Sequence, residues 1–190
     1  MYLMEFLNDI TVASIIPTRK ACVNDALNTL NVSQAKVIVE LGPGNGVFTK
    51  RLLQIAPADC RVIAIEMNKN LASELRSAIS DSRLEVIEQS ASDLGQILIE
   101  RKIQSVDFII SGIPFSLMSK IDKRNLCVEA ARFLSVKGTL VIYQARFPGG
   151  QFLVEKTIRP WFQVKRSRAM MFNLPPLYVL EAKLRTTLSV

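Results

Sequence analysis

Short apolar runs alternate with longer amphipathic stretches along most of this chain. Five runs have the length and density of buried strands, and they cover residues 36–41, 61–66, 84–87, 106–111 and 139–144. Between them apolar residues recur with the helical period of 3.6, which predicts helices at 19–30, 47–55, 68–80, 93–101 and 117–134. This order of strand and helix predicts an α/β fold, in which helices cover both faces of a mostly parallel sheet.

The end of the chain follows a different pattern. A helix that ends at Pro160 precedes two further strand-like stretches, at 162–171 and 177–186, which are joined through Asn173-Leu-Pro-Pro176. Two successive strands with a short turn between them pair antiparallel. We therefore expect a hairpin at one edge of the sheet. The chain has no internal repeat and no low-complexity linker, so its 190 residues are expected to form one domain.

The first residues carry a pattern of their own. An apolar stripe at helical spacing predicts a helix, and it consists of Leu3, Phe6, Leu7 and Ile10. Residues 1–16 are too short to span a bilayer and lack the basic start of a signal peptide. Two interpretations stay open: a helix in the membrane interface, or a lid packed on the domain. We treat residues 1–30 as a helical extension of the single domain.

The first strand runs into a glycine-rich turn, Glu40-Leu-Gly-Pro-Gly-Asn-Gly46. Glycine leaves the backbone accessible and adopts angles that other residues avoid, so a nucleoside-bearing ligand can lie across the end of this strand. A dinucleotide fingerprint would need glycine where Val47 stands, and a phosphate-binding P-loop would need Gly-Lys-Ser/Thr. The remaining form, Glu-x-Gly-x-Gly-x-Gly, resembles the first motif of Rossmann-like methyltransferases that use S-adenosylmethionine (SAM).

An acidic residue follows at the spacing that such a site requires. The second strand ends in Glu66, twenty residues beyond the glycine turn, and Met67 comes next. A carboxylate at the tip of the neighbouring strand can accept hydrogen bonds from both ribose hydroxyls, and a methionine offers a polarizable face to adenine. The alternative is a surface glutamate that merely closes a strand.

Composition excludes several other kinds of chemistry. The chain has no histidine, which removes Ser-His-Asp and Cys-His catalysis and the usual zinc sites. Its three cysteines form no CxxC pair, so we expect neither a metal nor a disulfide, and a cytoplasmic setting. Methyl transfer from SAM suits such a chain, because the cofactor carries its own leaving group and the protein mainly aligns donor and acceptor.

Positive charge is concentrated in the second half of the chain. Residues 1–110 hold 11 Lys and Arg against 13 Asp and Glu, whereas residues 111–190 hold 13 against 4. In Rossmann-like methyltransferases the second half shapes the acceptor side, so the resemblance points to an anionic partner. Nucleic acid and the inner face of an anionic membrane both qualify. The alternative is a basic surface that serves solubility alone.

The third strand leads into Glu88-Gln-Ser-Ala-Ser-Asp-Leu94, where methyltransferases place a turn beneath the adenine. We expect Ser90 and Ala91 to lie at the adenine, with Asp93 as an alternative partner for its exocyclic amine. The same residues also suit the cap of the following helix.

The fourth strand ends in Ser111-Gly-Ile-Pro-Phe-Ser116. This fragment is similar to the Asn-Leu-Pro-Tyr motif of ribosomal RNA adenine dimethyltransferases, in which the Asn side chain and nearby backbone hold an adenine amine. Here Gly112 stands at the Asn position and offers no side-chain acceptor. The Ser-Gly-Ile-Pro form instead resembles the Ser-Gly-Leu-Pro stretch of bacterial phospholipid N-methyltransferases. Residues 11–20, 40–53 and 173–176 also resemble segments of that family.

This resemblance implies a seven-stranded Rossmann-like sheet with an antiparallel C-terminal edge hairpin, and SAM as cofactor. The cofactor-binding residues it implies, together with those argued above, are Glu40, Gly42, Pro43, Gly44, Asn45, Gly46, Phe48, Thr49, Glu66, Met67, Ser90, Ala91 and Ser111. The acceptor pocket is expected to comprise Ser111, Gly112, Ile113, Pro114, Phe115 and Tyr143.

The implied reaction is methylation of the amine head group of a phospholipid, phosphatidylethanolamine in the first place. Tyr143 and the backbone carbonyls of 111–113 are candidates for orienting the amine, and the Phe115 ring for stabilising a methylated cation. No residue is singled out as the base. Two other interpretations stay open: an adenine dimethyltransferase of ribosomal RNA, and a small-molecule methyltransferase or non-catalytic SAM-binding protein.

Overall fold

The computed structural model describes residues 20–146, 150–171 and 176–185. The helix expected within residues 1–16 and most of the turn expected at 173–176 lie outside these ranges, so both stay predictions.

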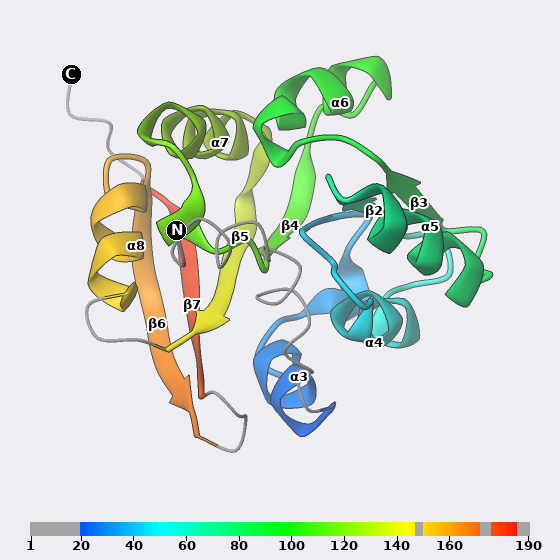
Figure 1. Ribbon diagram of the computed structural model, residues 1–190, viewed down its shortest axis with the longest axis horizontal. Coiled ribbons are helices and arrows are strands. Elements are labelled where there is room, and N and C mark those ends of the chain that lie inside the picture. Colours follow the sequence, from blue (N-terminus) through cyan, green and yellow to red (C-terminus); the bar gives the residue numbers. More distant parts are fainter. Residues whose placement is uncertain (1–19, 147–149, 172–175, 186–190) are drawn as a thin grey trace, which may run out of the picture.

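The described residues form a seven-stranded sheet in the order β3-β2-β1-β4-β5-β7-β6 (Figure 1). Its strands are β1 (Val37–Leu41), β2 (Arg61–Ile65), β3 (Leu84–Ile87), β4 (Val106–Ser111), β5 (Leu134–Ala145), β6 (Phe162–Met170) and β7 (Leu177–Leu184). The first five strands pair in parallel, and β7 pairs antiparallel with both β5 and β6. The predicted parallel sheet with an antiparallel edge hairpin is therefore confirmed.

The helices begin and end close to their predicted positions. They are α3 (Lys20–Leu27), α4 (Val47–Ile55), α5 (Lys69–Ala78), α6 (Leu94–Glu100), α7 (Lys120–Phe133) and α8 (Gly150–Ile158). The helix expected from residue 117 starts later, because the Ser119 side chain caps α7 by accepting from the Asp122 amide at 3.1 Å. The residues before it, Phe115–Leu117, form a separate 3₁₀ turn.

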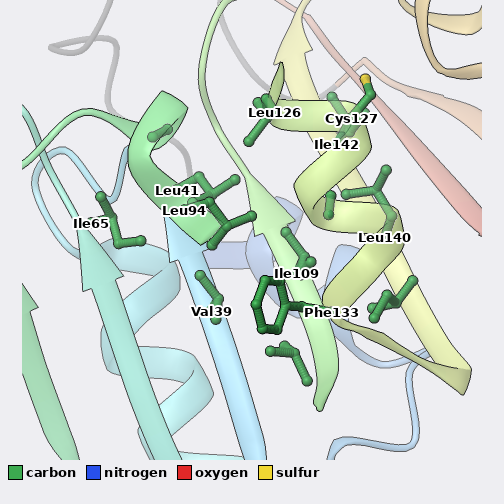
Figure 2. Close-up of a cluster of buried hydrophobic side chains, with 14 of the residues drawn as sticks. Val39, Leu41, Ile65, Leu94, Ile109, Leu126, Cys127, Phe133, Leu140 and Ile142 are labelled. Carbon is green, nitrogen blue, oxygen red and sulfur yellow. The ribbon is translucent and has the colours of Figure 1, made fainter. Parts of the chain in front are cut away.

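Alternate side chains of each strand enter two separate cores, one on each face of the sheet. Figure 1 shows α6 and α7 on one face and α3 and α4 on the other. On the first face, Val39, Ile109 and Ile142 pack against helix residues such as Leu94 and Phe133 (Figure 2). On the second face, the strand residues that pack against α3 and α4 include Ile38, Val62, Ile110 and Val141.

The chain reverses its direction across the sheet at β1. Strands β2 and β3 extend the sheet to one side of β1, whereas β4 and β5 extend it to the other. In such sheets a crevice opens at the carboxyl ends of the strands where the order reverses. Two backbone hydrogen bonds join the turns there: the Gly42 amide donates to the Ile65 carbonyl, and the Gly112 amide to the Leu41 carbonyl, both at 2.9 Å. The glycine turn and the turn after β4 are therefore neighbours.

At the opposite end of the sheet, where the parallel strands begin, Arg83 links the end of α4 to the start of β3 by hydrogen bonds. Its guanidinium donates to the backbone carbonyls of Leu53 at 2.7 Å and of Ala56 and Pro57 at 3.0 Å, and it pairs with Asp81. These hydrogen bonds satisfy carbonyls that a helix leaves unpaired at its C-terminus. The hydrogen bonds from Arg83 also lower the pKa of Asp81 to about 2.

We expect Arg83→Ala to lower the free energy of unfolding by about 2 kcal/mol, because several charge-assisted hydrogen bonds are lost together. This corresponds to a fall in melting temperature of roughly 4–8 °C for a chain of this size. Thermal denaturation measures it, with Arg76→Ala as the control, since Arg76 is more exposed, donates to a single carbonyl, that of Val86, and forms a long ion pair with Glu88 at 3.9 Å. Equal losses in the two variants would contradict the role of Arg83.

Candidate active site

A cavity of about 610 Å³ lies at the carboxyl ends of the parallel strands. The turns that follow β1, β2, β3 and β4 and the last residues of β5 all contribute to its walls. Most of the residues predicted from the sequence come together here: Gly42, Pro43, Gly44, Asn45, Phe48, Glu66, Met67, Ser90, Ala91, Gly112, Ile113, Pro114 and Tyr143. The remaining predicted residues, Glu40, Gly46, Thr49, Ser111 and Phe115, are not among the lining residues.

The glycine turn has a backbone that only glycine adopts easily. Gly42, Gly44 and Gly46 have φ angles of 68°, 54° and 74°, all in the left-handed region. A methyl group added to Gly42 would lie 3.0 Å from the Ile113 side chain, and one added to Gly46 would collide with Leu75 of α5. The turn thus serves two purposes: it exposes its backbone to the cavity, and it lets α5 and the turn after β4 pack closely against it.

Glu66 lies one residue beyond β2, and its carboxylate is held by two backbone amides. The amide of Gly44 donates to one oxygen at 3.2 Å and the amide of Asn68 to the other at 3.0 Å. The side chain is only 6% exposed, yet it lines the cavity. These contacts aim the carboxylate across the glycine turn, where it can accept hydrogen bonds from the hydroxyls of a ribose.

Glu40 is a buried carboxylate beneath the glycine turn. It lies on the β1 face that is covered by α4, and one of its oxygens accepts from the Thr49 hydroxyl at 2.6 Å. The other oxygen, Oε1, has no hydrogen-bond partner among the described residues. Burial, with a smaller contribution from the charge of Glu66, raises the pKa of Glu40 to about 7. The site therefore contains an acidic oxygen that lacks a donor.

The structure of the turn after β3 distinguishes Ser90 from Asp93 as the predicted contact to adenine. Ser90 and Ala91 line the cavity, whereas Asp93 is not among the lining residues. The Ser90 hydroxyl accepts from the Ser92 amide at 3.2 Å and so caps a 3₁₀ turn, as the helix-cap interpretation expects. Met67, which follows the neighbouring strand β2, lines the same cavity with 74% of its surface exposed, which leaves its thioether free to cover a flat ring.

The turn after β4 forms the opposite wall. The Gln144 side chain, which is 5% exposed, donates to the Ile113 carbonyl at 2.7 Å and fixes this turn against β5. Sequence reasoning missed Gln144, although its place near the end of a predicted strand was a usable signal. It also missed further lining residues at the start of α5 and around the start of α7, which are Asn68, Leu117, Met118, Ser119 and Asp122.

The expectation that Phe115 faces the acceptor is wrong. Its ring is 2% exposed and belongs to the hydrophobic core formed with α6 and α7. The side chain, which belongs to the 3₁₀ turn after β4, lies in this core and not at the cavity wall, so its ring is unavailable to a cation in the cavity. Ser111 is also buried, and its hydroxyl accepts from the Ile113 amide at 3.4 Å, which makes it a support of the turn.

Two aromatic side chains stack at the cavity, one from α4 and one from β5. The rings of Phe48 and Tyr143 lie 3.9 Å apart, with 11° between their planes. Burial raises the pKa of the Tyr143 phenol well above its usual range, and the charges of Glu40 and Glu66 raise it further. Tyr143 is therefore a neutral phenol, able to donate and accept hydrogen bonds near neutral pH.

Comparison with known proteins identifies the family. The family model of ribosomal RNA adenine dimethylase matches residues 14–142. The chain belongs to this family. The ornithine lipid N-methyltransferase of Singulisphaera acidiphila is 32% identical over 135 residues, which are 70% of each protein. The ribosomal RNA small subunit methyltransferase A of Mycoplasma capricolum subsp. capricolum is 28% identical over 103 residues, which are 52% of this chain but only 36% of that protein.

Solved structures agree on the fold. The precorrin-6y C5,15-methyltransferase of Geobacter metallireducens superposes with a TM-score of 0.69 at 13% identity, over 90% of this chain and 91% of that one. The glycopeptide N-methyltransferase MtfA, complexed with sinefungin, gives 0.69 at 12% identity, over 90% and 96%. The family match makes the protein a SAM-dependent methyltransferase, and the solved structures agree with its Rossmann-like sheet.

The residues at the cavity fit this cofactor. SAM supplies an activated methyl group on a positively charged sulfur, together with an ammonium, a carboxylate, a ribose and an adenine. Glu66 suits the ribose hydroxyls, and Met67, Ser90 and Ala91 suit the adenine. Glu40 is buried beneath the glycine turn and does not line the cavity, but its carboxylate adds negative charge behind the turn, which suits a cationic group such as the ammonium. Among residues 20–146, 150–171 and 176–185, no group of side chains could hold a metal, and no helix is long and apolar enough to cross a membrane.

We expect Glu66→Ala in this methyltransferase to weaken SAM binding by at least about tenfold, since charged hydrogen bonds to the ribose are lost. Isothermal titration calorimetry measures the affinity. Glu88→Ala is a matched control, because Glu88 also lies one residue beyond a strand but is exposed and does not line the cavity. Unchanged affinity in Glu66→Ala would contradict the ribose contact.

We expect Glu40 to make the stability of the cofactor-free protein depend on pH. Its pKa rises from 4.5 in the unfolded chain to about 7 in the folded one. Between these values the folded state holds a proton that the unfolded state releases, so stability falls as pH rises, by about 3 kcal/mol in total. The stabilisation is complete below pH 4.5 and lost above pH 7.

Glu40→Gln should remove this part of the pH dependence, because the amide does not titrate. Urea denaturation at pH 5 and pH 8 without SAM measures the difference between variant and wild type. Glu74→Gln, an exposed carboxylate on α5, should behave as wild type does. A wild-type pH dependence that persists in Glu40→Gln would show that another group is responsible.

Proposed function

We propose that this methyltransferase transfers methyl groups to the amine of a membrane-lipid head group, phosphatidylethanolamine in the first place. The observation that carries the proposal is Gly112 at the end of β4. A family member that methylates adenine is expected to present an asparagine side chain at this point, and here no amide is available. An aliphatic amine does not need that amide, because it is a much stronger nucleophile than the exocyclic amine of adenine.

The composition of the cavity walls supports a cationic acceptor. Two of the lining residues, Glu66 and Asp122, are acidic, and none of the described lining residues is Lys or Arg. A head-group ammonium gains from such a lining, whereas the phosphates of a nucleic acid do not. The apolar residues Ile113, Leu117 and Met118 line the same cavity, and Leu117 is 45% exposed. They suit the apolar part of a lipid.

The relatives and the charge distribution give further support. The ornithine lipid N-methyltransferase shares 32% identity over 135 residues of this chain, and an ornithine head group also carries a primary alkyl amine. The positive charge of residues 111–190 lies outside the cavity lining, where it suits an anionic membrane surface. Peripheral binding to such a surface is therefore part of the proposal.

The chain's own residues assist the reaction by positioning and desolvation. An alkyl ammonium has a pKa near 10 and must lose its proton before it can attack. The apolar wall formed by Ile113, Pro114 and Met118 disfavours the charged form and so lowers that pKa. Asp122, whose carboxylate accepts from the Ser119 hydroxyl at 2.7 Å, attracts the ammonium to the cavity. Alignment with the methyl donor supplies most of the remaining acceleration.

A second candidate function is adenine methylation in ribosomal RNA. The family model and the small subunit methyltransferase A relatives favour it, although the matched segment is only 36% of the Mycoplasma capricolum protein. It predicts label in RNA adenine and a steep salt dependence of RNA binding. The acidic lining and Gly112 speak against it.

The test uses methyl-labelled SAM with three acceptors offered separately. These are vesicles of phosphatidylethanolamine with an anionic lipid, vesicles of ornithine lipid, and small-subunit ribosomal RNA. We expect label in lipid, and the two vesicle preparations distinguish the head groups. Vesicles of phosphatidylcholine with the same anionic lipid are the control, because their amine is already fully methylated. Label in RNA alone would favour the second function, and no label at saturating SAM would contradict both.

A further inference from the structure

The backbone conformation at position 112 does not require glycine. Among the described residues the glycines with left-handed φ are Gly42, Gly44 and Gly46, and Gly112 is not one of them. Its backbone is therefore accessible to any L-residue. The absence of a side chain at position 112 must have another physical reason.

That reason is the aromatic ring of Tyr143. A Cβ atom built on Gly112 would lie 2.6 Å from Cζ and 2.9 Å from Cε2 of this ring, and closer still to its hydroxyl oxygen. Real carbon atoms do not approach so closely. The ring and hydroxyl of Tyr143 thus fill the space in which a side chain at position 112 would begin.

Tyr143 cannot easily vacate this space. It lies in β5, whose preceding residue Ile142 is paired with Ser111 of β4, and on its other side it is paired with Val179 of β7. Its ring is stacked on Phe48. The backbone register and the stack together fix the hydroxyl beside Gly112, at the wall of the cavity.

We infer that the Tyr143 hydroxyl takes over the positioning of the acceptor amine from the missing side-chain amide, and that Gly112 is small in order to admit it. This inference rests on the proposed function, because it takes the acceptor to be an aliphatic amine. The hydroxyl oxygen accepts a hydrogen bond from an N–H of the amine, while the stacked rings present an aromatic face to the methylated cation. The Phe48–Tyr143 pair thereby assumes the role that the sequence suggested for Phe115.

The electrostatics of the site agree with a positioning role. Burial and the charges of Glu40 and Glu66 keep the phenol protonated near neutral pH, so it orients the amine and does not act as its base. Those same carboxylates favour a positive charge close to the ring. If the hydroxyl positions the amine, its removal lowers kcat/KM for the acceptor and leaves the affinity for SAM unaltered.

The first experiment compares Tyr143→Phe with wild type on phosphatidylethanolamine vesicles. We expect kcat/KM for the lipid to fall about tenfold, the worth of one hydrogen bond to a polar or charged partner. The SAM affinity and melting temperature should stay close to wild type, because the stacked ring remains. Tyr178→Phe is the control, since the Tyr178 hydroxyl donates to the Gly150 carbonyl at 3.4 Å and does not line the cavity.

The second experiment tests the steric coupling with a double-mutant cycle. Gly112→Ala should lower kcat/KM at least about thirtyfold in the wild-type background, but less than about threefold in a Tyr143→Ala background, where the methyl group has room. Melting temperatures of the four proteins measure the same coupling without any acceptor. Equal effects of Gly112→Ala in the two backgrounds would overturn the steric argument.

The outcomes separate this inference from the proposed function. If wild type labels lipid and Tyr143→Phe behaves like Tyr178→Phe, the positioning role is overturned and lipid methylation stands. If wild type labels no lipid, the proposed function fails and the amine role fails with it, while the melting temperatures still report the Gly112–Tyr143 coupling. A selective loss of acceptor use in Tyr143→Phe, together with a rescued Gly112→Ala, supports both parts.

Discussion

The pairing of β1 with two parallel neighbours is the constraint on which the site depends. Because β2 and β4 flank β1 in register, the turns that follow the three strands begin at the same level of the sheet. The amides of Gly42 and Gly112 then bond to the carbonyl groups that end the neighbouring strands. Left-handed glycines are needed only on the β1 turn, where the chain must bend away at once to start α4. The remaining walls of the cavity follow from these fixed points.

Acidic and basic side chains occupy different parts of the molecule. Carboxylates of Glu40, Glu66 and Asp122 gather at or beneath the cavity, while the excess of Lys and Arg lies elsewhere on the second half of the chain. Above pH 7 the buried carboxylate of Glu40 is charged and lacks a full set of hydrogen-bond donors, which lowers the free energy of unfolding. The cofactor-free protein is therefore less stable than its hydrophobic core alone would make it. A cationic ligand offsets that cost when it binds. Stability and cofactor affinity are linked through this one side chain.

Much of the fold could be predicted from the sequence because the apolar pattern is locally consistent. The bounds of α4, β3 and β4 agree with their predicted ranges, since each element buries residues at the period of its own geometry. β5 is longer than predicted, because exposed residues around Gly138 resemble a turn. The glycine turn and Glu66 could be predicted, since their chemistry follows from spacing. The burial of Phe115 depends on how its turn packs against the core, which the sequence alone does not reveal. The position of Gln144 near a strand end was a signal, but its contact with Ile113 depends on how β4 and β5 meet.

The edges of the sheet show how the molecule limits unwanted association. β6 has a partner on one side only, and its exposed residues include Lys165 and Arg166. A free edge is a template for strand addition, and repulsion between like charges makes a second copy a poor partner. The other edge, β3, is only four residues long. The basic residues of this hairpin thus have a second effect besides any attraction to a surface: their mutual repulsion disfavours edge-to-edge pairing with another copy of the chain.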